Sequence, residues 1–214
     1  MKIVCISASN IIGKGAEKGT SHELCKIVID EISKKNQETC GKIIELKTHA
    51  IQPCMGCGRC FNSHRCFIDD DFNDIYLKII KSDFVFFVSP HYAPIPSKLS
   101  ALLEKMEQIT FLHWGKDNSY KSEVYGKKAG IISHGGGGTW ALSSYKKMVN
   151  DTIANALDTI QMKLIPFNDE WDTGISIPVK KVTFQSCDMF PSQEYDWEFI
   201  ANRIKEYANK VINS

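Results

Sequence analysis

The sequence predicts an α/β fold, a three-layer sandwich in which helices cover both faces of a five-stranded parallel sheet. Three observations predict it. Short, continuous apolar runs alternate with longer segments whose apolar residues recur at helical spacing. Polar loops rich in glycine or serine follow several of the apolar runs directly. No internal repeat or low-complexity linker interrupts this pattern, so we expect one domain over residues 1–214.

Composition and charge argue against several classes of protein. Lys and Arg total 26 and Asp and Glu total 25, giving a net charge of +1. No overall field therefore favours nucleic acid or an anionic membrane. The apolar run near the N-terminus is too short for a secretion signal, and no stretch is long enough to span a bilayer. We therefore expect a cytoplasmic protein that binds anions through local groups.

The first predicted strand, residues 2–7, leads through a polar loop to a helix predicted over residues 21–35. The loop is rich in Gly, Ser and amide side chains, and Ser or Thr directly before the helix is expected to be its N-cap. Free N–H groups and the helix dipole both attract an anion at such a helix start. A phosphate group fits this loop, and an ordinary capped helix after a flexible loop is the alternative.

The remaining elements follow from periodicity and from the position of turn residues. We expect Asp69, Asp70 and Asp71 to be helix caps rather than metal ligands, because acidic residues favour the first turn of a helix. An insertion or an edge hairpin is expected over about residues 168–190. The remaining predicted strands are 42–47, 83–90, 128–134 and 161–167. The remaining predicted helices are 69–82, 139–157 and 193–212, together with a helix after the third strand that buries Leu99, Leu102, Leu103 and Met106.

Two further loops lie at strand ends, where open α/β sheets bind ligands. Ser89, Pro90 and Tyr92 end the third strand, and Gly135 to Gly138 follow the fourth. A tyrosine can stack on a planar ring, and glycines let a ligand approach the backbone; plain packing and a loose connection are the alternatives. In the strand order 2-1-3-4-5, the first, third and fourth strands meet at the switch point where flavin mononucleotide (FMN) binds.

Four cysteines form a compact motif, C-x2-C-x2-C-x5-C, within a loop that contains Gly56 and Gly58. Thiols at every third position can converge on one polynuclear site, which suits an iron–sulfur cluster. A zinc site fits this spacing less well, and reduced thiols without metal are the third alternative. Ligand spacing without an export signal indicates a reducing compartment and no disulfide framework. The motif comprises Cys54, Cys57, Cys60 and Cys66, whereas Cys5, Cys25, Cys40 and Cys187 are expected to be core or surface thiols.

From residue 2 to about residue 160 the chain resembles the flavodoxin-like NAD(P)H-dependent FMN reductases, and within them the iron–sulfur flavoproteins. The resemblance rests on the cysteine motif followed by FIDDD and on the segment SPHYAPIPSKLSALLEK. That segment is similar to a family pattern of Ser/Thr-Pro-x-Tyr, a short loop and a helix. The resemblance implies a flavodoxin-like, FMN-binding sandwich that carries the cysteine-rich loop, about residues 50–70, as an insertion.

The resemblance also implies the residues that contact FMN. The chain departs from the family at Asn10 and Ile11, which replace the Pro and Arg of the phosphate loop, and Lys14 or Lys18 would supply the missing charge. In the family the compact cysteines ligate a [4Fe-4S] cluster in some members and are unoccupied in others. The candidate contacts are Ser9, Asn10, Thr20 and Ser21 for the phosphate, Ser89, Pro90, His91, Tyr92 and Ile95 for the isoalloxazine ring, and Ser133, His134, Gly135 and Gly136 for its far side.

The implied function is that of an FMN-dependent oxidoreductase that takes electrons from NAD(P)H. The acceptor is a small molecule such as a quinone or flavin, or a ferredoxin-like protein if a cluster is present. Flavin carries the chemistry, so we identify no catalytic side chain. The alternatives are an electron carrier or redox or metal sensor without turnover, and a zinc-stapled scaffold.

Family members often complete the flavin site with a neighbouring subunit, so the resemblance implies a homodimer or homotetramer. The cysteine loop follows the second strand, which lies beside the first, and we therefore expect it at the rim of the flavin pocket. If it holds a cluster, it is an electron relay. If it is empty, it is a wall of the flavin or substrate site.

Overall fold

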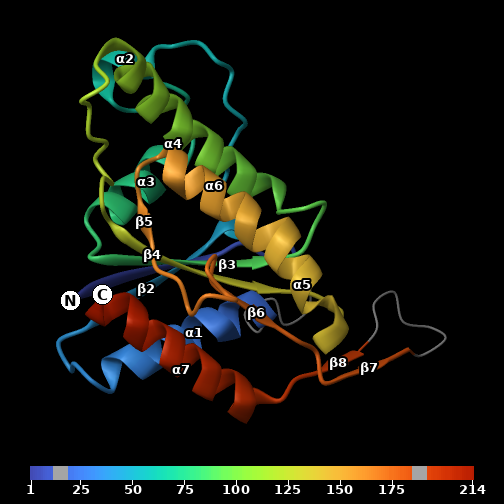
Figure 1. Ribbon diagram of the computed structural model, residues 1–214. Coiled ribbons are helices and arrows are strands. Elements are labelled where there is room, and N and C mark those ends of the chain that lie inside the picture. The colour runs from blue at the N-terminus through green and yellow to red at the C-terminus, as the bar shows by residue number, and fades with distance from the viewer. Residues whose placement is uncertain (12–18, 185–191) are drawn as a thin grey trace.

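The computed structural model describes residues 1–11, 19–184 and 192–214. Its centre is a parallel sheet with the strand order β2-β1-β3-β4-β5, and helices lie on both faces (Figure 1). This order confirms the predicted flavodoxin-like sandwich. Within the described ranges, no helix is both long and apolar enough to cross a membrane. Lys14, Lys18 and Cys187 lie outside the described residues.

The central strands are continuous apolar runs because both faces of the sheet are covered. Strand β1 (Lys2–Ser7) lies between β2 (Cys40–Glu45) and β3 (Phe84–Pro90), and β3 pairs in turn with β4 (Lys128–His134). All of these pairings are parallel. Their carboxyl ends therefore meet at one edge of the sheet.

Two groups of helices cover the sheet, and Figure 1 shows them on opposite sides of it. On one face lie α1 (Thr20–Ser33) and α7 (Trp197–Asn213), which pack against each other. On the other face lie α3 (Phe72–Ile80), α4 (Ser97–Lys116) and α6 (Asp151–Thr159). The shorter helical turns are Leu46–Thr48, α2 (Cys60–Ser63), Thr139–Ala141, α5 (Leu142–Tyr145) and the π-helical turn Lys146–Asn150.

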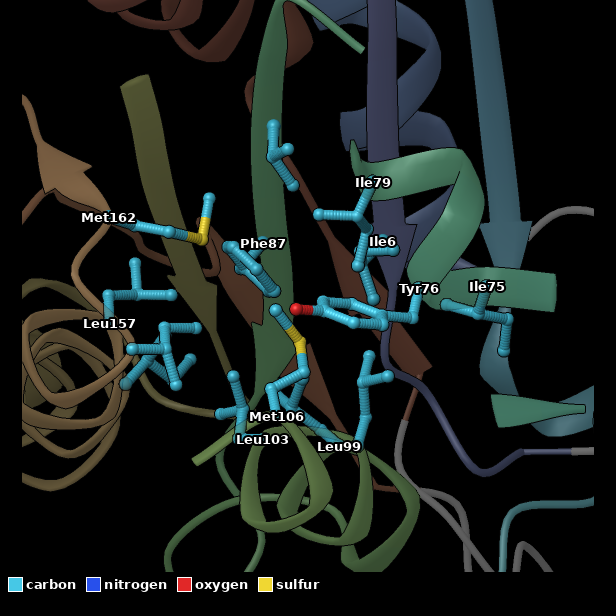
Figure 2. Close-up of a cluster of buried hydrophobic side chains, with 14 of the residues drawn as sticks. Ile6, Ile75, Tyr76, Ile79, Phe87, Leu99, Leu103, Met106, Leu157 and Met162 are labelled. Carbon is cyan, nitrogen blue, oxygen red and sulfur yellow. The ribbon is translucent and has the colours of Figure 1, made fainter. Parts of the chain in front are cut away.

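The core is divided by the sheet into two clusters, as the two-residue period of a strand requires. In β1, Ile3 and Cys5 pack towards α1 and α7, whereas Val4 and Ile6 pack towards the opposite helices. Figure 2 shows the second cluster, in which Phe87 of β3 meets side chains from α3, α4 and α6. The predicted buried residues of α4 belong to it: Leu99, Leu102, Leu103 and Met106.

The predicted fifth strand, 161–167, is wrong in extent. Only Lys163–Leu164 (β5) pairs with the start of β4, and Ile175–Ile177 (β6) takes over the same side of β4 towards its end. Pro166 explains the break, because proline has no N–H to donate to a ladder. The segment expected as an insertion therefore contributes a strand to the main sheet, which has six strands.

Three other predicted boundaries also differ from the structure. The second strand begins at Cys40 instead of residue 42, and the predicted helix 139–157 is interrupted by the π-helical turn. The last helix begins at Trp197, because the Asp196 carboxylate accepts a bond from the N–H of Phe199 and caps it. Before this helix, β7 (Lys181–Thr183) pairs antiparallel with β8 (Ser192–Glu194) in a separate two-stranded sheet, and β8 lies beyond the segment 168–190 in which an insertion or edge hairpin was expected.

Candidate functional site

The predicted strand-end residues gather at one edge of the sheet. Ser89 of β3 pairs in register with Ser133 of β4, and Pro90 pairs with His134. The N–H of His91 donates to the carbonyl of His134 at 2.9 Å, which carries the pairing one residue further. Ser9 follows β1 on the other side of β3 and is buried. The ends of β1, β3 and β4 thus bring Ser9, Ser89, Ser133 and His134 to the same edge of the sheet.

The start of α1 faces this edge without a side-chain cap. Its N-cap is Gly19, and no side-chain hydrogen bond caps the helix among the described residues. The prediction that a Ser or Thr caps it is therefore wrong. Thr20 is the first residue of the helix, and its hydroxyl lies 3.4 Å from the hydroxyl of Tyr195. Within the part of the chain that the structure describes, no side chain caps the N–H groups of the first turn, and N–H groups at a helix start can bind an anion.

The hydroxyl of Ser21, in the first turn of α1, bonds to a histidine at the end of β4. Ser21 Oγ lies 2.7 Å from His134 Nε2, and both side chains are buried. Burial lowers the pKa of His134 from 6.5 to about 4, so the imidazole is neutral at physiological pH. This bond joins the start of α1 to the end of β4 across the candidate site.

The loop after β3 presents side chains outward from the same edge. His91 and Tyr92 are exposed, and Ile95 is half-buried. The N–H of Tyr92 donates to the carbonyl of Pro94 at 2.8 Å, which closes the loop on itself. Asn10 and Ile11, at the other side of the edge, are also exposed, and the Ile11 N–H donates to Ser9 Oγ at 3.3 Å.

The glycine run after β4 is shaped by Tyr145, which the sequence analysis did not identify. The Tyr145 hydroxyl accepts a hydrogen bond from the N–H of Gly137 at 2.6 Å. A Cβ on Gly135 would lie 2.5 Å from the Tyr145 ring and hydroxyl, so only glycine fits there. Gly136 has more room, with Gln193 at 3.3 Å as its nearest neighbour. No local sequence signal marks Tyr145, because the contact depends on the path of the loop.

A second feature missed from the sequence is a polar cluster at the end of β2. Glu45 accepts a bond from Ser7 Oγ at 2.9 Å, and His22 Nδ1 lies 2.6 Å from the other carboxylate oxygen. Lys47 lies 3.7 Å from the same carboxylate. The carboxylate thus joins β1, α1 and the residues after β2.

The four motif cysteines line one pocket against the middle of α4. Cys54, Cys57, Cys60 and Cys66 share this pocket with side chains of α4 and with apolar residues of the loop. Burial raises the pKa of the Cys60 thiol, and the three neighbouring motif cysteines raise it further. Within the described residues, however, no group of three or more His, Cys, Asp or Glu side chains stands ready to hold a metal ion.

The aspartates after the motif close the cysteine loop at its base. Asp71 accepts a bond from the N–H of Ala50 at 2.7 Å, and Asp70 accepts one from the N–H of Gln52 at 2.9 Å. Asp70 also accepts a bond from the N–H of Phe72, the first residue of α3, but the N-cap residue is Asp71 and its side chain makes no capping bond, so the predicted capping role is wrong. The two ends of the loop are thereby held together, and the cysteines lie on the segment between them.

Comparison with known proteins agrees with this geometry. The family model for NADPH-dependent FMN reductase matches residues 1–164. An iron–sulfur flavoprotein of Methanosarcina thermophila is 32% identical over 108 residues, which cover 49% of this chain and 52% of that protein. The chain is thus matched to about half the length of this relative.

Solved structures show the same fold at low sequence identity. RosB with bound 8-demethyl-8-formylriboflavin-5'-phosphate superposes with a TM-score of 0.60 at 12% identity, over 100% of this chain and 78% of that one. Oxidised flavodoxin 1 of Bacillus cereus gives a TM-score of 0.54 at 11% identity, over 100% of this chain and 98% of that one. With the family match over most of its length, the chain belongs to the NADPH-dependent FMN reductase family.

Proposed function

We propose that this protein is an FMN-dependent oxidoreductase that takes electrons from NAD(P)H. The observation that carries the proposal is the meeting of three strand ends with an uncapped helix start at one edge of the sheet. That edge is where doubly wound sheets bind a mononucleotide. Bound FMN would supply the electron-transfer chemistry, and the protein would bind and orient it.

The FMN phosphate would lie at the start of α1. Ser9, Asn10 and Thr20 border this position, and the first-turn N–H groups supply donors. Because the hydroxyl of Ser21 is already bonded to His134, Ser21 would serve the phosphate through its backbone N–H. Lys14 and Lys18 remain candidates for the positive charge that the family's arginine provides.

The isoalloxazine ring would lie between the two other loops. Ser89, Pro90, His91, Tyr92 and Ile95 would contact one side of it, and Ser133 to Gly136 the other. Support comes from the close approach of Tyr145 to Gly135, which fixes the backbone of the glycine loop. No side chain is assigned a chemical step, since the flavin carries it.

The four motif cysteines would hold a [4Fe-4S] cluster, and the protein would then pass electrons singly to a ferredoxin-like partner. Their spacing supports this assignment, whereas within the described residues their side chains are not grouped to hold a metal ion. Zinc and metal-free thiols are the competing occupancies, and a metal-free protein would serve small acceptors such as quinones or flavins. A homodimer or homotetramer in the cytoplasm is part of the same proposal.

The test is anaerobic purification followed by quantification of FMN, iron and sulfide, together with steady-state NAD(P)H oxidation with a quinone or ferricyanide. We expect FMN in every chain and turnover above background. FMN without turnover would assign the protein to the electron carriers instead, and protein that does not bind FMN would refute the proposal.

Cysteine variants test the cluster separately. Cys57→Ala removes a proposed ligand, and Cys40→Ala is the matched control because Cys40 is exposed on β2, outside the pocket. We expect Cys57→Ala to lose iron and sulfide while keeping FMN, and Cys40→Ala to keep all three. Equal iron content in both variants would contradict the assignment of the motif.

A further inference from the structure

The second strand of the C-terminal hairpin, β8, borders two loops of the candidate site. A Cβ on Gly136 of the glycine loop would lie 3.3 Å from Gln193 Nε2 of β8. At the start of α1, Thr20 Oγ1 lies 3.4 Å from the hydroxyl of Tyr195, which follows β8 directly. Both hairpin residues lie beyond residue 164, where the family match ends. The family match therefore assigns them no role.

Two hydrogen bonds determine which end of the Gln193 amide faces the glycine loop. Thr20 Oγ1 donates to Tyr195 Oη, and the Tyr195 hydroxyl donates to Gln193 Oε1 at 2.7 Å. Tyr195 thus holds the carbonyl end of the amide, and the NH2 end is the one beside Gly136. An amide NH2 group carries two N–H donors. Gln193 therefore presents donors to a ligand that approaches the backbone of Gly136.

The side chains along this segment alternate between two faces. Gln193 and Tyr195 share a face, since they are bonded to each other, whereas the carboxylate of Glu194 between them pairs with Lys180 at 3.5 Å. The ring of Tyr195 packs beside that of Trp197, with 5.2 Å between their centroids. Burial raises the pKa of the Tyr195 hydroxyl, so it keeps the proton that it donates.

We propose that Gln193 is a flavin-binding residue whose amide N–H donates to a carbonyl oxygen of the FMN isoalloxazine ring, and that Tyr195 is its positioning residue. The inference rests on the proposed function, in which Gly136 contacts the ring. Because the carbonyl oxygens of the isoalloxazine ring lie on one edge, a donor beside Gly136 also selects the edge that faces the glycine loop. The hairpin thus adds a binding wall to the three strand-end loops.

The bond also favours the reduced flavin over the oxidised flavin. A hydride from NAD(P)H brings two electrons and one proton, so the ring gains one negative charge on reduction. A fixed N–H donor beside a ring oxygen stabilises such charge. Loss of the donor should therefore weaken FMN binding and lower the midpoint potential of the bound FMN together.

The test compares wild type with Gln193→Leu, Tyr195→Phe and the double variant that combines them. Glu194→Gln is the matched control, because it changes the intervening residue, whose side chain pairs with Lys180 instead. Apoprotein of each is titrated with FMN by fluorescence, and the two-electron midpoint potential of the bound FMN is measured. Far-UV circular dichroism and urea unfolding check that each variant is folded.

We expect Gln193→Leu to raise the Kd for FMN about fivefold, as for loss of one hydrogen bond. It should also lower the equilibrium constant for reduction about tenfold, which is about 30 mV for two electrons. Tyr195→Phe should act in the same direction by a smaller factor. The double variant should match Gln193→Leu, because both residues act through one contact. Glu194→Gln should stay within about twofold of wild type, because an exposed ion pair contributes little.

Folded Gln193→Leu protein with the FMN affinity and potential of wild type overturns the inference. A higher Kd with an unchanged potential also overturns it, because Gln193 would then support the loop without contacting the ring. Additive effects of the two single changes contradict the positioning role of Tyr195. Wild-type apoprotein that does not bind FMN refutes the proposed function itself, and this inference with it.

Discussion

Acidification should destabilise the protein through His134, and the size of the effect follows from its burial. The imidazole is 6% exposed and bonds to Ser21, and burial lowers its pKa from 6.5 to about 4. The unfolded chain therefore binds this proton near pH 6.5, whereas the folded protein binds it only near pH 4. As the pH falls through this window, the unfolded state gains the proton first, so the free energy of unfolding decreases. At ~1.36 kcal/mol per pH unit, the loss amounts to about 3 kcal/mol.

The assay is urea unfolding of the apoprotein at several pH values between 7.5 and 4. His134→Gln keeps a hydrogen-bonding side chain beside Ser21 but does not titrate, and His91→Gln is the control because His91 is exposed. Carboxylates that titrate near pH 4 affect all three proteins alike. We expect the free energy of unfolding of wild type and His91→Gln to fall by about 3 kcal/mol more than that of His134→Gln across this range. Parallel pH profiles for all three proteins would refute the reasoning.

Three further predictions concern the glycine loop and the base of the cysteine loop. Gly135→Ala should lower the free energy of unfolding by about 1–3 kcal/mol and weaken FMN binding in a fluorescence titration, because the added Cβ would lie 2.5 Å from Tyr145. Gly138→Ala is the control, and it should bind FMN normally because the nearest neighbour of its Cβ is at 3.5 Å. Tyr145→Phe should lower the free energy of unfolding by about 1–3 kcal/mol, because it leaves a buried N–H of the loop unpaired. Burial alone would raise the pKa of Asp70, but Lys105 and two N–H groups hold it below its usual value. The ionised Asp70 carboxylate therefore stabilises the folded protein above about pH 4, and this stabilisation is lost as the pH falls through the pKa of the folded state. Urea unfolding at pH 2–5 should show this pH dependence in wild type and not in Asp70→Asn.

The strands that carry the candidate site could be predicted because they are buried on both faces. The central residues of β1, β3 and β4 are apolar, and such runs are too short for long helices. The fifth strand could not be predicted to its full extent, because its pairing depends on which residues reach the free side of β4. Pro166 ends β5, and β6 continues the sheet from a segment that is separated from it along the chain.

The sequence predicts which residues lie near the candidate site better than it predicts what their side chains bind. Ser21 stands where a helix cap is expected, yet its partner His134 is 113 residues away in sequence. The competing bond exists only because β4 ends beside the start of α1, a consequence of the strand order. Likewise Tyr145 reaches the glycine loop only because the chain turns back after Gly138. Position along a predicted element determines which residues are near the site, whereas packing determines what each of them binds.

Helix α4 connects the two candidate redox sites of this chain. It begins at Ser97, directly after the loop proposed to contact the flavin ring, and Lys105 lies eight residues further along it. At 1.5 Å per residue, the cysteine pocket is therefore about 12 Å along the helix from its start. The pocket lies against the middle of α4, and the expected position of the cysteine loop at the rim of the flavin pocket stays a prediction. Because a packed helix fixes this separation, changes at Lys105 should alter the cysteine pocket while FMN affinity stays constant, and FMN affinity then reports whether a variant has disturbed more than the pocket.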